Sequence, residues 1–466
     1  MAFGFLKKNN CADTIFYNGH IITQDPEFPE AEAVACKNGY IQAVGDNAYM
    51  DEFKGSDTEM VDLEGKYLYP GFINTKIPFV FQAFRDLCLA VDVDDDLDYV
   101  ISQLQDYVEE NPDADTYFVF GFNGEIVEGI DEEELAVRLD QISEDKPILL
   151  LDDLGSTFRT NTMANQILVE TAEEECVEIL TLSYVIELFL PFDYEQSQML
   201  TMGIMNEAAD MGFTSVLTLG TPSFMNSAFL GSLLEIHTEE DLKQRYFFSQ
   251  LQQVMIGNGT TGYSLVNKQT ACVELGDEVS YNFLNVRLNP LGQWSKEGLV
   301  EMCKDSIERN FGIYMDCPDQ DAAYLAYDVL DQLREDGLAK ALLVVGLPED
   351  VDLSFSSQFV HFDSIIQTSF LELENSSFVR AKSTQEALDD LTIGGAEILG
   401  MSDLLGSIEP DKYADFTVFN ENILDFSLGK FNQPHCEMTV VAGQIVYDAQ
   451  DAADMEMYDM LSTQQF

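Results

Sequence analysis

Residues 69–78 read Tyr-Pro-Gly-Phe-Ile-Asn-Thr-Lys-Ile-Pro, and this stretch decides the fold expected for the whole chain. It is an apolar strand that begins after a Pro-Gly pair and ends in polar residues. The preceding residues 12–68 consist of short alternating strands, whereas strand and helix patterns alternate after it. The stretch therefore marks the passage from an all-β unit into a parallel α/β unit.

Local patterns predict the elements on both sides of this junction. Strand, Asn-Gly, strand patterns at 13–23 and 32–45 predict two β-hairpins. Apolar periodicity predicts helices over 98–110, 132–142 and 199–211, and strands within 117–124, 146–152 and 212–218. The predicted fold class is α/β, with the strands after residue 69 forming one parallel sheet.

The junction resembles that of the amidohydrolase superfamily, which reads Pro-Gly, two apolar residues, then Asp-x-His-x-His. Residues 383–419 resemble the family's closing segment, T-x-x-x-A-x-x-L-G followed by G-S-I-E-x-G-K-x-A-D, and 440–447 resemble its final hairpin. The internal order resembles a subgroup containing N-substituted formamide deformylases and exoenzyme-regulatory-like proteins. The resemblance implies a (β/α)8 TIM-like barrel, complete or degraded, plus a β-sandwich formed from both chain termini. The implied boundaries are 1–68 and 401–466 for the two sandwich parts and 69–400 for the barrel.

The resemblance also implies a metal site, and this chain departs from it at every position that can be aligned. Asn74 replaces the family's Asp, Lys76 and Pro78 replace the two histidines, Asp316 lies nearest a third histidine, and Gly346 or its neighbour replaces a fourth. Proline has no donor atom, and a protonated lysine repels a divalent cation. We therefore expect a vestigial pocket with no catalytic residue, no cofactor and no metal.

Several residues in this chain have both a chemical and a structural interpretation. His361 could be a displaced zinc ligand or a core histidine, and Lys268 is the only candidate for a bridging lysine. Lys76 could be a reactive amine or the ionic partner of an acid such as Asp316. The pair Asp316 and Asp319 could hold a hard cation or form a solvated loop.

Two further motifs have structural explanations. The aspartates at 92–98 suggest calcium, but helix capping accounts for part of the pattern. The G-x-G-x-x-G at 257–262 lacks a strand-then-helix context and is interpreted as a loop.

Charge and composition limit the partners. Asp plus Glu number 84 against 23 Lys plus Arg, a net charge of −61, which repels nucleic acid and anionic membranes. High salt, an acidic milieu, or binding of calcium, other cations or a basic partner would each explain this charge. Eight scattered cysteines without C-x-x-C suggest buried free thiols in a reducing compartment. With no signal-peptide pattern and no membrane-length apolar run, a cytoplasmic location is expected, with non-classical export left open.

Three functions remain open. The first is a non-enzymatic structural or assembly protein that forms homo-oligomers or larger particles. The second is a non-catalytic binding module that uses the old barrel pocket or the acidic face. The third is a metal-dependent hydrolase of non-peptide C–N bonds with a rearranged site.

Overall fold

The computed structural model describes two compact units, each considered by itself. The first comprises residues 1–78, 205–221 and 236–466, and the second 79–204 and 222–235. The described residues are 11–77, 88–92, 95–127, 129–152, 158–174, 185, 188–189, 194–221, 223–238, 241–252, 254–257, 260–263, 273–288, 294–317, 319–338, 343–346, 365–367, 371–372, 377–378, 383–428 and 434–452.

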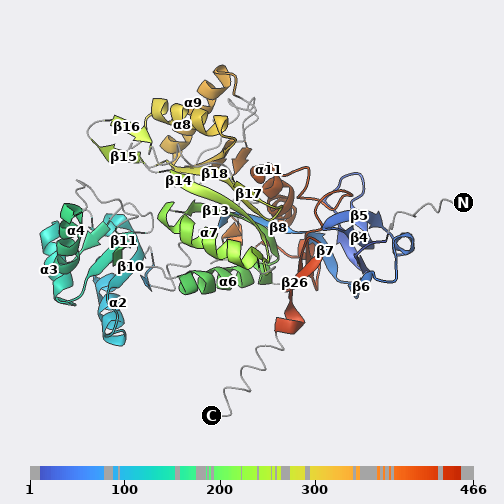
Figure 1. Cartoon of the computed structure of the whole chain (residues 1–466), viewed down its shortest axis with the longest axis horizontal. Helices are drawn as coiled ribbons and strands as arrows, with labels where there is room; N and C mark the ends of the chain where they lie inside the picture. Colours follow the sequence, from blue (N-terminus) through green and yellow to red (C-terminus); the bar gives the residue numbers. More distant parts are fainter. Residues whose placement is uncertain are drawn as a thin grey trace, which may run out of the picture. The chain divides into compact units, whose positions relative to one another are not determined.

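In the first unit, strands from both ends of the chain form a β-sandwich (Figure 1). One sheet has the order β5-β4-β1-β6, and the other β26-β25-β24-β7-β2-β3. Phe16 of the first sheet packs edge-on against Phe416 of the second, with ring centroids 5.7 Å apart. The bounds are β1 Thr14–Tyr17, β2 His20–Ile22, β3 Glu30–Ala31, β4 Ala33–Lys37, β5 Tyr40–Gly45, β6 Glu59–Asp62, β7 Tyr67–Pro70, β24 Phe416–Phe419, β25 Cys436–Val441 and β26 Gln444–Asp448. The sandwich built from both termini is therefore confirmed.

The two Asn-Gly turns behave differently. Asn38 and Gly39, both with positive φ, join β4 to β5 as the predicted hairpin. The prediction for the first turn was wrong, because β1 pairs with β4 and β6, whereas β2 pairs with β3 and β7. Asn18 has a φ of 60°, but Gly19 is not among the positive-φ glycines, so the two-residue hairpin geometry is not met. This turn instead moves the chain from one sheet to the other.

The chain enters the barrel-like sheet at Gly71, as expected. β7 pairs with β24 in the sandwich, and β8 (Phe72–Ile77) pairs with β13 in the next sheet. A Cβ on Gly71 would lie 2.1 Å from Thr214 Oγ1, so only glycine allows this approach.

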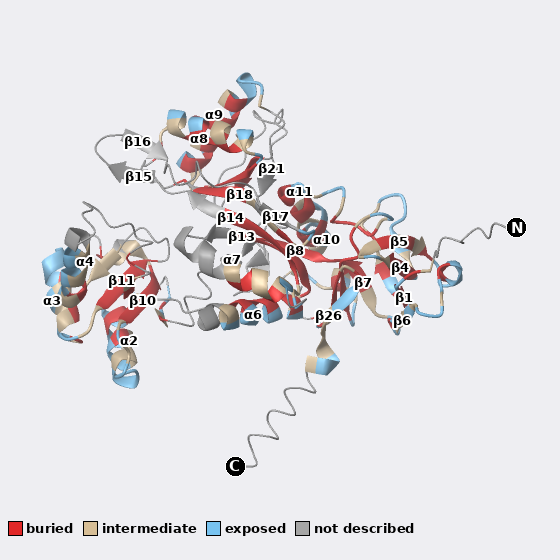
Figure 2. Ribbon diagram, in the orientation of Figure 1, coloured by how far each residue is buried: buried red, intermediate tan, exposed pale blue. Residues whose placement is uncertain are grey.

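Parallel strands form a curved half-barrel sheet, buried along much of its length (Figure 2). Its order is β21-β20-β19-β18-β14-β13-β8, with β17 antiparallel to β18. The bounds are β13 Phe213–Thr221, β14 Arg245–Gln252, β17 Val273–Leu275, β18 Val279–Arg287, β19 Gly312–Asp316, β20 Leu343–Gly346 and β21 Ile365–Gln367. Among the described residues, no strand pairing closes β21 onto β8.

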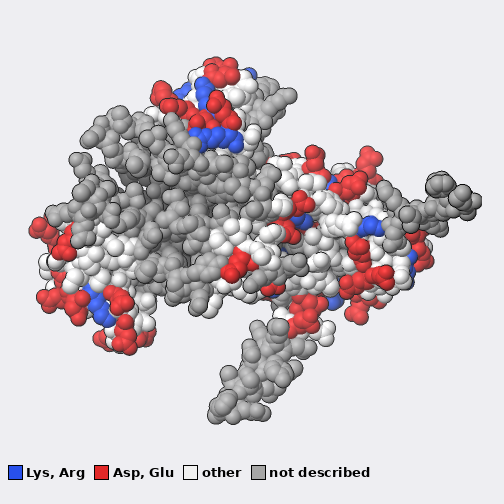
Figure 3. Space-filling view, in the orientation of Figure 1, with Lys and Arg blue, Asp and Glu red and all other residues white. Residues whose placement is uncertain are grey.

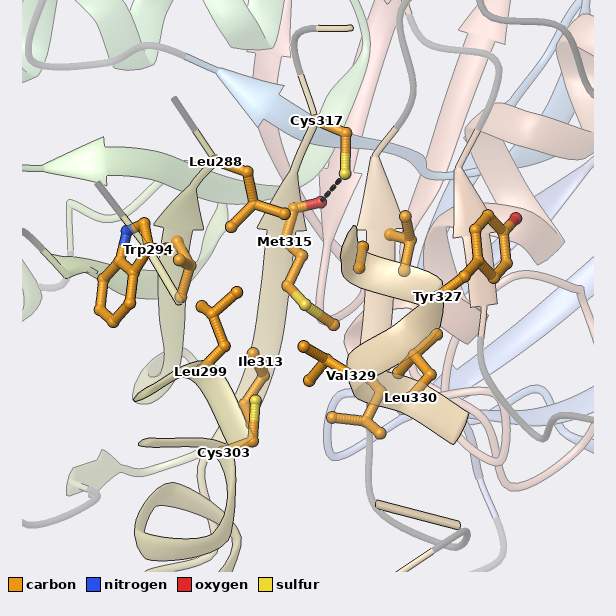
Figure 4. Close-up of a cluster of buried hydrophobic side chains, with 14 of the residues drawn as sticks. Leu288, Trp294, Leu299, Cys303, Ile313, Met315, Cys317, Tyr327, Val329 and Leu330 are labelled. Carbon is orange, nitrogen blue, oxygen red and sulfur yellow. Dashed lines mark hydrogen bonds between the residues drawn. The ribbon is translucent and has the colours of Figure 1, made fainter. Parts of the chain in front are cut away.

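Helices α8 (Lys296–Glu308) and α9 (Gln320–Glu335) cover one face of this sheet. Their apolar sides pack with Ile313 and Met315 of β19 in a cluster that excludes water (Figure 4). Between β14 and β18 the described residues form strands instead of a helix. β15 (Val254–Gly257) and β16 (Thr260–Tyr263) pair antiparallel, so the described residues of the G-x-G-x-x-G motif, Gly257 and 260–262, lie in strands, and the prediction of a loop was wrong for them.

A broken helix fills the region between the two end strands of the half-barrel. It runs through α10 (Thr384–Asp389), a π-helical turn (Asp390–Gly394) and α11 (Gly395–Leu399), and ends at Gly400 with a φ of 68°. α11 contacts both β8 and β21. The predicted glycine cap is confirmed.

The second unit has its own sheet, in the order β12-β11-β10-β9. We predicted that the strands near 117–122 and 148–152 belong to the barrel sheet, and this was wrong. β10 and β11 are parallel and fully buried, but they pair with each other here. Burial on both faces is common to all covered parallel sheets, so the pattern does not identify the sheet. The bounds are β9 Leu89–Ala90, β10 Tyr117–Phe122, β11 Ile148–Asp152, β12 Phe158–Thr160, α2 Leu97–Glu110, α3 Glu132–Asp140 and α4 Thr162–Glu174.

The remaining described elements are short or cross the division between the units. The division falls within α6 (Tyr194–Asp210) and α7 (Ser223–Thr238). The short elements are 3-10 turns at Tyr49–Glu52, Gly124–Val127 and Ile423–Asp425, and β22 Leu371–Glu372 and β23 Ser377–Phe378. No helix in the described part of the chain is long and apolar enough to cross a membrane.

Candidate functional site

The structure brings two predicted pocket residues together at one edge of the half-barrel. Asp316 ends β19, Gly346 ends β20, and the two are register partners. Asn74 lies on β8, at the other end of the strand order, where it pairs with Val216 and is buried. The backbone of Lys76 also belongs to β8, but its side chain is outside the described residues. Pro78, Lys268 and His361 lie outside the described residues altogether.

The space beside Gly346 is filled by Tyr314. A Cβ at position 346 would lie 2.4 Å from the Tyr314 hydroxyl oxygen and 2.9 Å from two of its ring carbons. Because side chains alternate along a strand, Tyr314 occupies the face opposite Met315 and the helices α8 and α9. Burial raises the pKa of the Tyr314 phenol well above its usual value, and Asp316 and Cys317 raise it further. A neutral phenol therefore stands where a side chain from the end of β20 would project.

Three other buried polar residues in the half-barrel, Asn285, Thr218 and Ser249, are neutral as well. Asn285 of β18 is 3% exposed and is the register partner of Tyr314. Its amide oxygen has no hydrogen-bond partner among the described atoms. Thr218 and Ser249 are also fully buried, and Ser249 donates to the Thr218 carbonyl. Among the described residues, no three His, Cys, Asp or Glu side chains gather closely enough to hold a metal ion.

Several polar motif residues have structural partners. Asp319 caps α9 by accepting from the Ala322 amide at 2.8 Å, and Asp96 caps α2 by accepting from the Tyr99 amide at 2.9 Å. Asn161, in the second unit, accepts from the backbone amides of residues 148 and 164 and donates to the carbonyls of residues 143 and 146. Asp319 and Asp96 therefore have a structural role as helix caps, and Asn161 links the start of β11 to the start of α4.

Sequence reasoning missed a buried ion pair at the opposite end of the half-barrel. Arg245 begins β14 and forms two hydrogen bonds with Asp415, at 2.7 and 3.1 Å, with both side chains 2% exposed. Burial by itself lowers the pKa of Arg245, but the paired carboxylate raises it above its usual value. The guanidinium also lies 3.7 Å from the centre of the Tyr413 ring. The signal in the sequence was Asp415 in the Ala-Asp-apolar motif, but nothing local identified its partner.

Next to this pair lies a polar groove of about 740 Å³. It is lined by the amino ends of β14 and β18 and by the hairpin turns at Asn38-Gly39 and Ala442-Gly443 of the sandwich. Tyr40 and Tyr413 lie in its wall with ring centroids 5.1 Å apart, and Tyr40 donates to Asp277 at 3.1 Å. The groove is thus distinct from the strand ends that carry Asp316 and Gly346.

Comparison with known proteins agrees with the fold. The Amidohydrolase family model matches residues 374–447. A metal-dependent hydrolase from Pyrococcus horikoshii OT3 superimposes with a TM-score of 0.61 at 14% identity, covering 89% of this chain and 99% of that one. A mutant of atrazine chlorohydrolase from Arthrobacter aurescens TC1, complexed with zinc and atraton, gives 0.56 at 13% identity over 93% and 95% of the chains. Residues 374–447 thus match the Amidohydrolase family, and the fold of the whole chain is similar to that of these hydrolases.

The relatives that match by sequence cover a smaller part of this chain than the solved structures do. Exoenzymes regulatory protein AepA of Pectobacterium carotovorum is 33% identical over 156 residues, which is 33% of this chain and 33% of that protein. Adenine deaminase of Methanococcoides burtonii is 38% identical over 68 residues, 15% of this chain and 11% of that enzyme. The matches thus span a third or less of these relatives, and they leave the subgroup as a prediction.

Proposed function

We propose that this amidohydrolase-like chain is catalytically degenerate and acts as a non-enzymatic structural or assembly protein. The single observation that carries the proposal is the position of Tyr314. Its hydroxyl group fills the volume into which a side chain from residue 346 would project. A histidine at that position would require Tyr314 to move, so the interior is packed for a glycine.

The residues at the positions aligned with the family's metal ligands suit a metal poorly. Catalytic zinc is held by about three histidine, cysteine or carboxylate ligands. The aligned positions provide an amide at Asn74, one carboxylate at Asp316 and no side chain at Gly346. The polar groups next to Gly346 are the buried neutral phenol of Tyr314 and, on the neighbouring strand, the amide oxygen of Asn285, which has no hydrogen-bond partner among the described atoms. We therefore propose that no hydrolytic step proceeds through a metal in this chain.

The surface supports a role in association controlled by ions. Figure 3 shows Asp and Glu side chains spread over the described surface, and the chain carries a net charge of −61. Such a surface resists self-association at low salt and allows it when salt or divalent cations screen the charge. The buried clusters of the described core suit a protein that serves as a building block.

Two measurements on the purified chain test this proposal. Light scattering across salt and calcium concentrations should show growth to discrete oligomers or larger particles. Metal analysis after dialysis against zinc should show substoichiometric metal in the wild type, with no change in Asp316→Asn. A fixed monomer at every condition would contradict assembly, and stoichiometric zinc that is lost in Asp316→Asn would contradict degeneracy.

The second candidate is a hydrolase of C–N bonds with a rearranged site. It is favoured by the relatives, which include a deaminase and metal-dependent hydrolases. Hydrolysis of cyclic amides or exocyclic amines that disappears in Asp316→Asn, but not in the capping variant Asp319→Asn, would support it over the first proposal.

A further inference from the structure

Two Asn-Gly pairs of the sandwich differ in how their polar groups are held. The chain has four such pairs, at 18–19, 38–39, 123–124 and 258–259. The pair at 258–259 lies outside the described residues, and Asn123 is partly buried in the second unit. The pairs at 18–19 and 38–39 both lie in turns of the sandwich and both have an exposed asparagine. They can therefore be compared directly.

At the first pair, hydrogen bonds hold both the side-chain amide and the backbone amide that follows it. Asn18 Nδ2 donates to Asp62 Oδ1 at 2.7 Å, and the Gly19 N–H donates to the carbonyl of Glu32 at 3.2 Å. Gly19 is also buried against Leu63, since a Cβ on this glycine would lie 2.4 Å from Leu63 Cδ1. Both amides are therefore fixed in place.

At the second pair, the corresponding groups have no such restraint. Among the described residues, neither the side-chain amide of Asn38 nor the N–H of Gly39 has a hydrogen-bond partner. The turn is held by other atoms, because the Asn38 backbone N–H donates to Asp13 Oδ2 at 2.7 Å and the Gly39 carbonyl accepts from the Ala414 N–H at 2.9 Å. Asn38 is exposed and lines the polar groove, so water reaches its side chain.

We propose that Asn38 is a site of spontaneous modification, at which its side-chain amide becomes a carboxylate. The backbone nitrogen of Gly39 bonds to Asn38 Cγ and loses its proton to water. The bond between Cγ and Nδ2 breaks, and Nδ2 leaves as ammonia with a proton returned by water. A second water opens the cyclic imide at either of its two carbonyls, which gives aspartate or isoaspartate. Glycine favours the first step, because it has no Cβ to obstruct the attack and its backbone rotates freely.

The hydrogen bonds and the packing determine which pair reacts. Cyclisation at Asn18 requires an opening that breaks the bonds to Asp62 and Glu32 and lifts Gly19 from the core. Cyclisation at Asn38 requires a rotation within an exposed turn. Because packed and hydrogen-bonded sites open more rarely than exposed turns, we expect the reaction at Asn38 to be at least about tenfold faster.

The modification changes the wall of the polar groove. It adds a carboxylate beside Asp13, and isoaspartate also lengthens the backbone of the turn by one carbon. A Cβ on Gly39 would lie 3.3 Å from Ala442 Cβ, so this turn packs closely on the neighbouring hairpin turn. Isoaspartate at residue 38 therefore loosens the contacts of the turn with Ala414 and Ala442. This inference does not depend on the proposed function.

Incubation of the full native chain in mildly alkaline water enriched in a heavy oxygen isotope tests the proposal. Each modified asparagine takes its new oxygen from this water, so mass spectrometry of peptides digested in ordinary water counts only the reaction of the folded chain. The Asn38 peptide should gain the label at least about tenfold faster than the Asn18 peptide, and should contain both aspartate and isoaspartate. Equal rates at the two asparagines, or aspartate alone at residue 38, would overturn the proposal.

The unfolded chain and a matched pair of variants test the structural explanation. In urea both asparagines precede glycine in a free chain, so their rates should come within about threefold of each other. Asp62→Ala removes the acceptor of Asn18 Nδ2 and should raise the rate at Asn18 by about threefold. Asp51→Ala, which changes an exposed acid that does not bond to Asn18, should leave that rate unchanged. A tenfold ratio that persists in urea, or equal rates at Asn18 in the two variants, would contradict the control by hydrogen bonding.

Discussion

At the residue scale, the ion pair between Arg245 and Asp415 connects the half-barrel to the sandwich. Asp415 accepts from the guanidinium and also from the backbone amide of Ala442 at 2.8 Å. Arg245 in turn donates to the carbonyl of Asp277 at 2.8 Å. The pair thus holds the start of β14 against two turns that are distant in sequence.

Asp415→Asn should destabilise the chain by about 3–5 kcal/mol, because it leaves a buried guanidinium without a counter-ion. Urea unfolding measures the loss. The control is Asp98→Asn, which removes the exposed partner of Arg138 and should cost less than about 1 kcal/mol. Equal effects of the two substitutions would contradict a structural role for the buried pair.

Glu409 is expected to make a pH-dependent contribution to the free energy of unfolding. Its hydrogen bond from Ser407 and its pairing with Lys412 hold the pKa of the Glu409 carboxyl below its usual value. The ionised form is therefore stabilised by folding. This stability is present above the unfolded-state value of about 4.3 and is lost as pH falls through the folded-state pKa.

Glu409→Gln should lower stability by up to about 0.5 kcal/mol at neutral pH, a small value because Glu409 is 41% exposed and screened by solvent. The difference from wild type should close as the sample is acidified below about pH 4. Thermal unfolding at several pH values checks this, with Glu64→Gln as the control for losing one surface charge. A stability difference between Glu409→Gln and the wild type that widens in acid would contradict this prediction.

At the scale of elements, α11 completes the half-barrel core. Its Ala396, Ile398 and Leu399 pack with apolar residues of six strands. Gly395 makes this approach possible, since a Cβ there would lie 2.7 Å from the Ile73 Cβ. A helix thus occupies the region between the end strands β8 and β21.

Gly395→Ala should destabilise the chain by about 1–3 kcal/mol, because the added methyl group overlaps β8. Gly203 of α6 is the matched control, since a Cβ there would meet no atom within 4 Å. Gly203→Ala should stabilise by up to about 1 kcal/mol through helix propensity. Chemical denaturation of both variants measures the two changes in unfolding free energy. Changes of the same sign in Gly395→Ala and Gly203→Ala would contradict the packing argument.

At the scale of the whole molecule, like charges dominate. With 84 acidic and 23 basic side chains, repulsion opposes the compact state. The described ion pairs are mostly partly exposed, and pairs of that kind contribute little stability. Screening by salt should therefore matter more here than any single surface pair.

The melting temperature should rise steadily with potassium chloride up to about 1 M, where the Debye length falls to about 3 Å. Calcium should act at lower ionic strength than potassium if carboxylates bind it diffusely. Differential scanning calorimetry with sucrose as the control separates charge screening from general solute exclusion. A melting temperature that is flat in salt would mean that repulsion is unimportant.

The sequence alone determined the features that depend on local patterns. The Pro-Gly entry at residues 70–71, the helices near 98–110 and 132–142 and the glycine cap at residue 400 follow from periodicity and turn chemistry. The resemblance at both ends of the chain predicted the sandwich and the barrel class. Each of these involves neighbours in sequence or a motif that can be recognised in one stretch.

Only the tertiary structure decided which segments meet. It separated β1 from β2, placed β10 and β11 in a second sheet, and paired Arg245 with Asp415 across 170 positions. It also placed Tyr314 over Gly346 and shaped the polar groove. Burial patterns show that a strand is covered but not by what, because register and side-chain packing depend on partners far away in the chain.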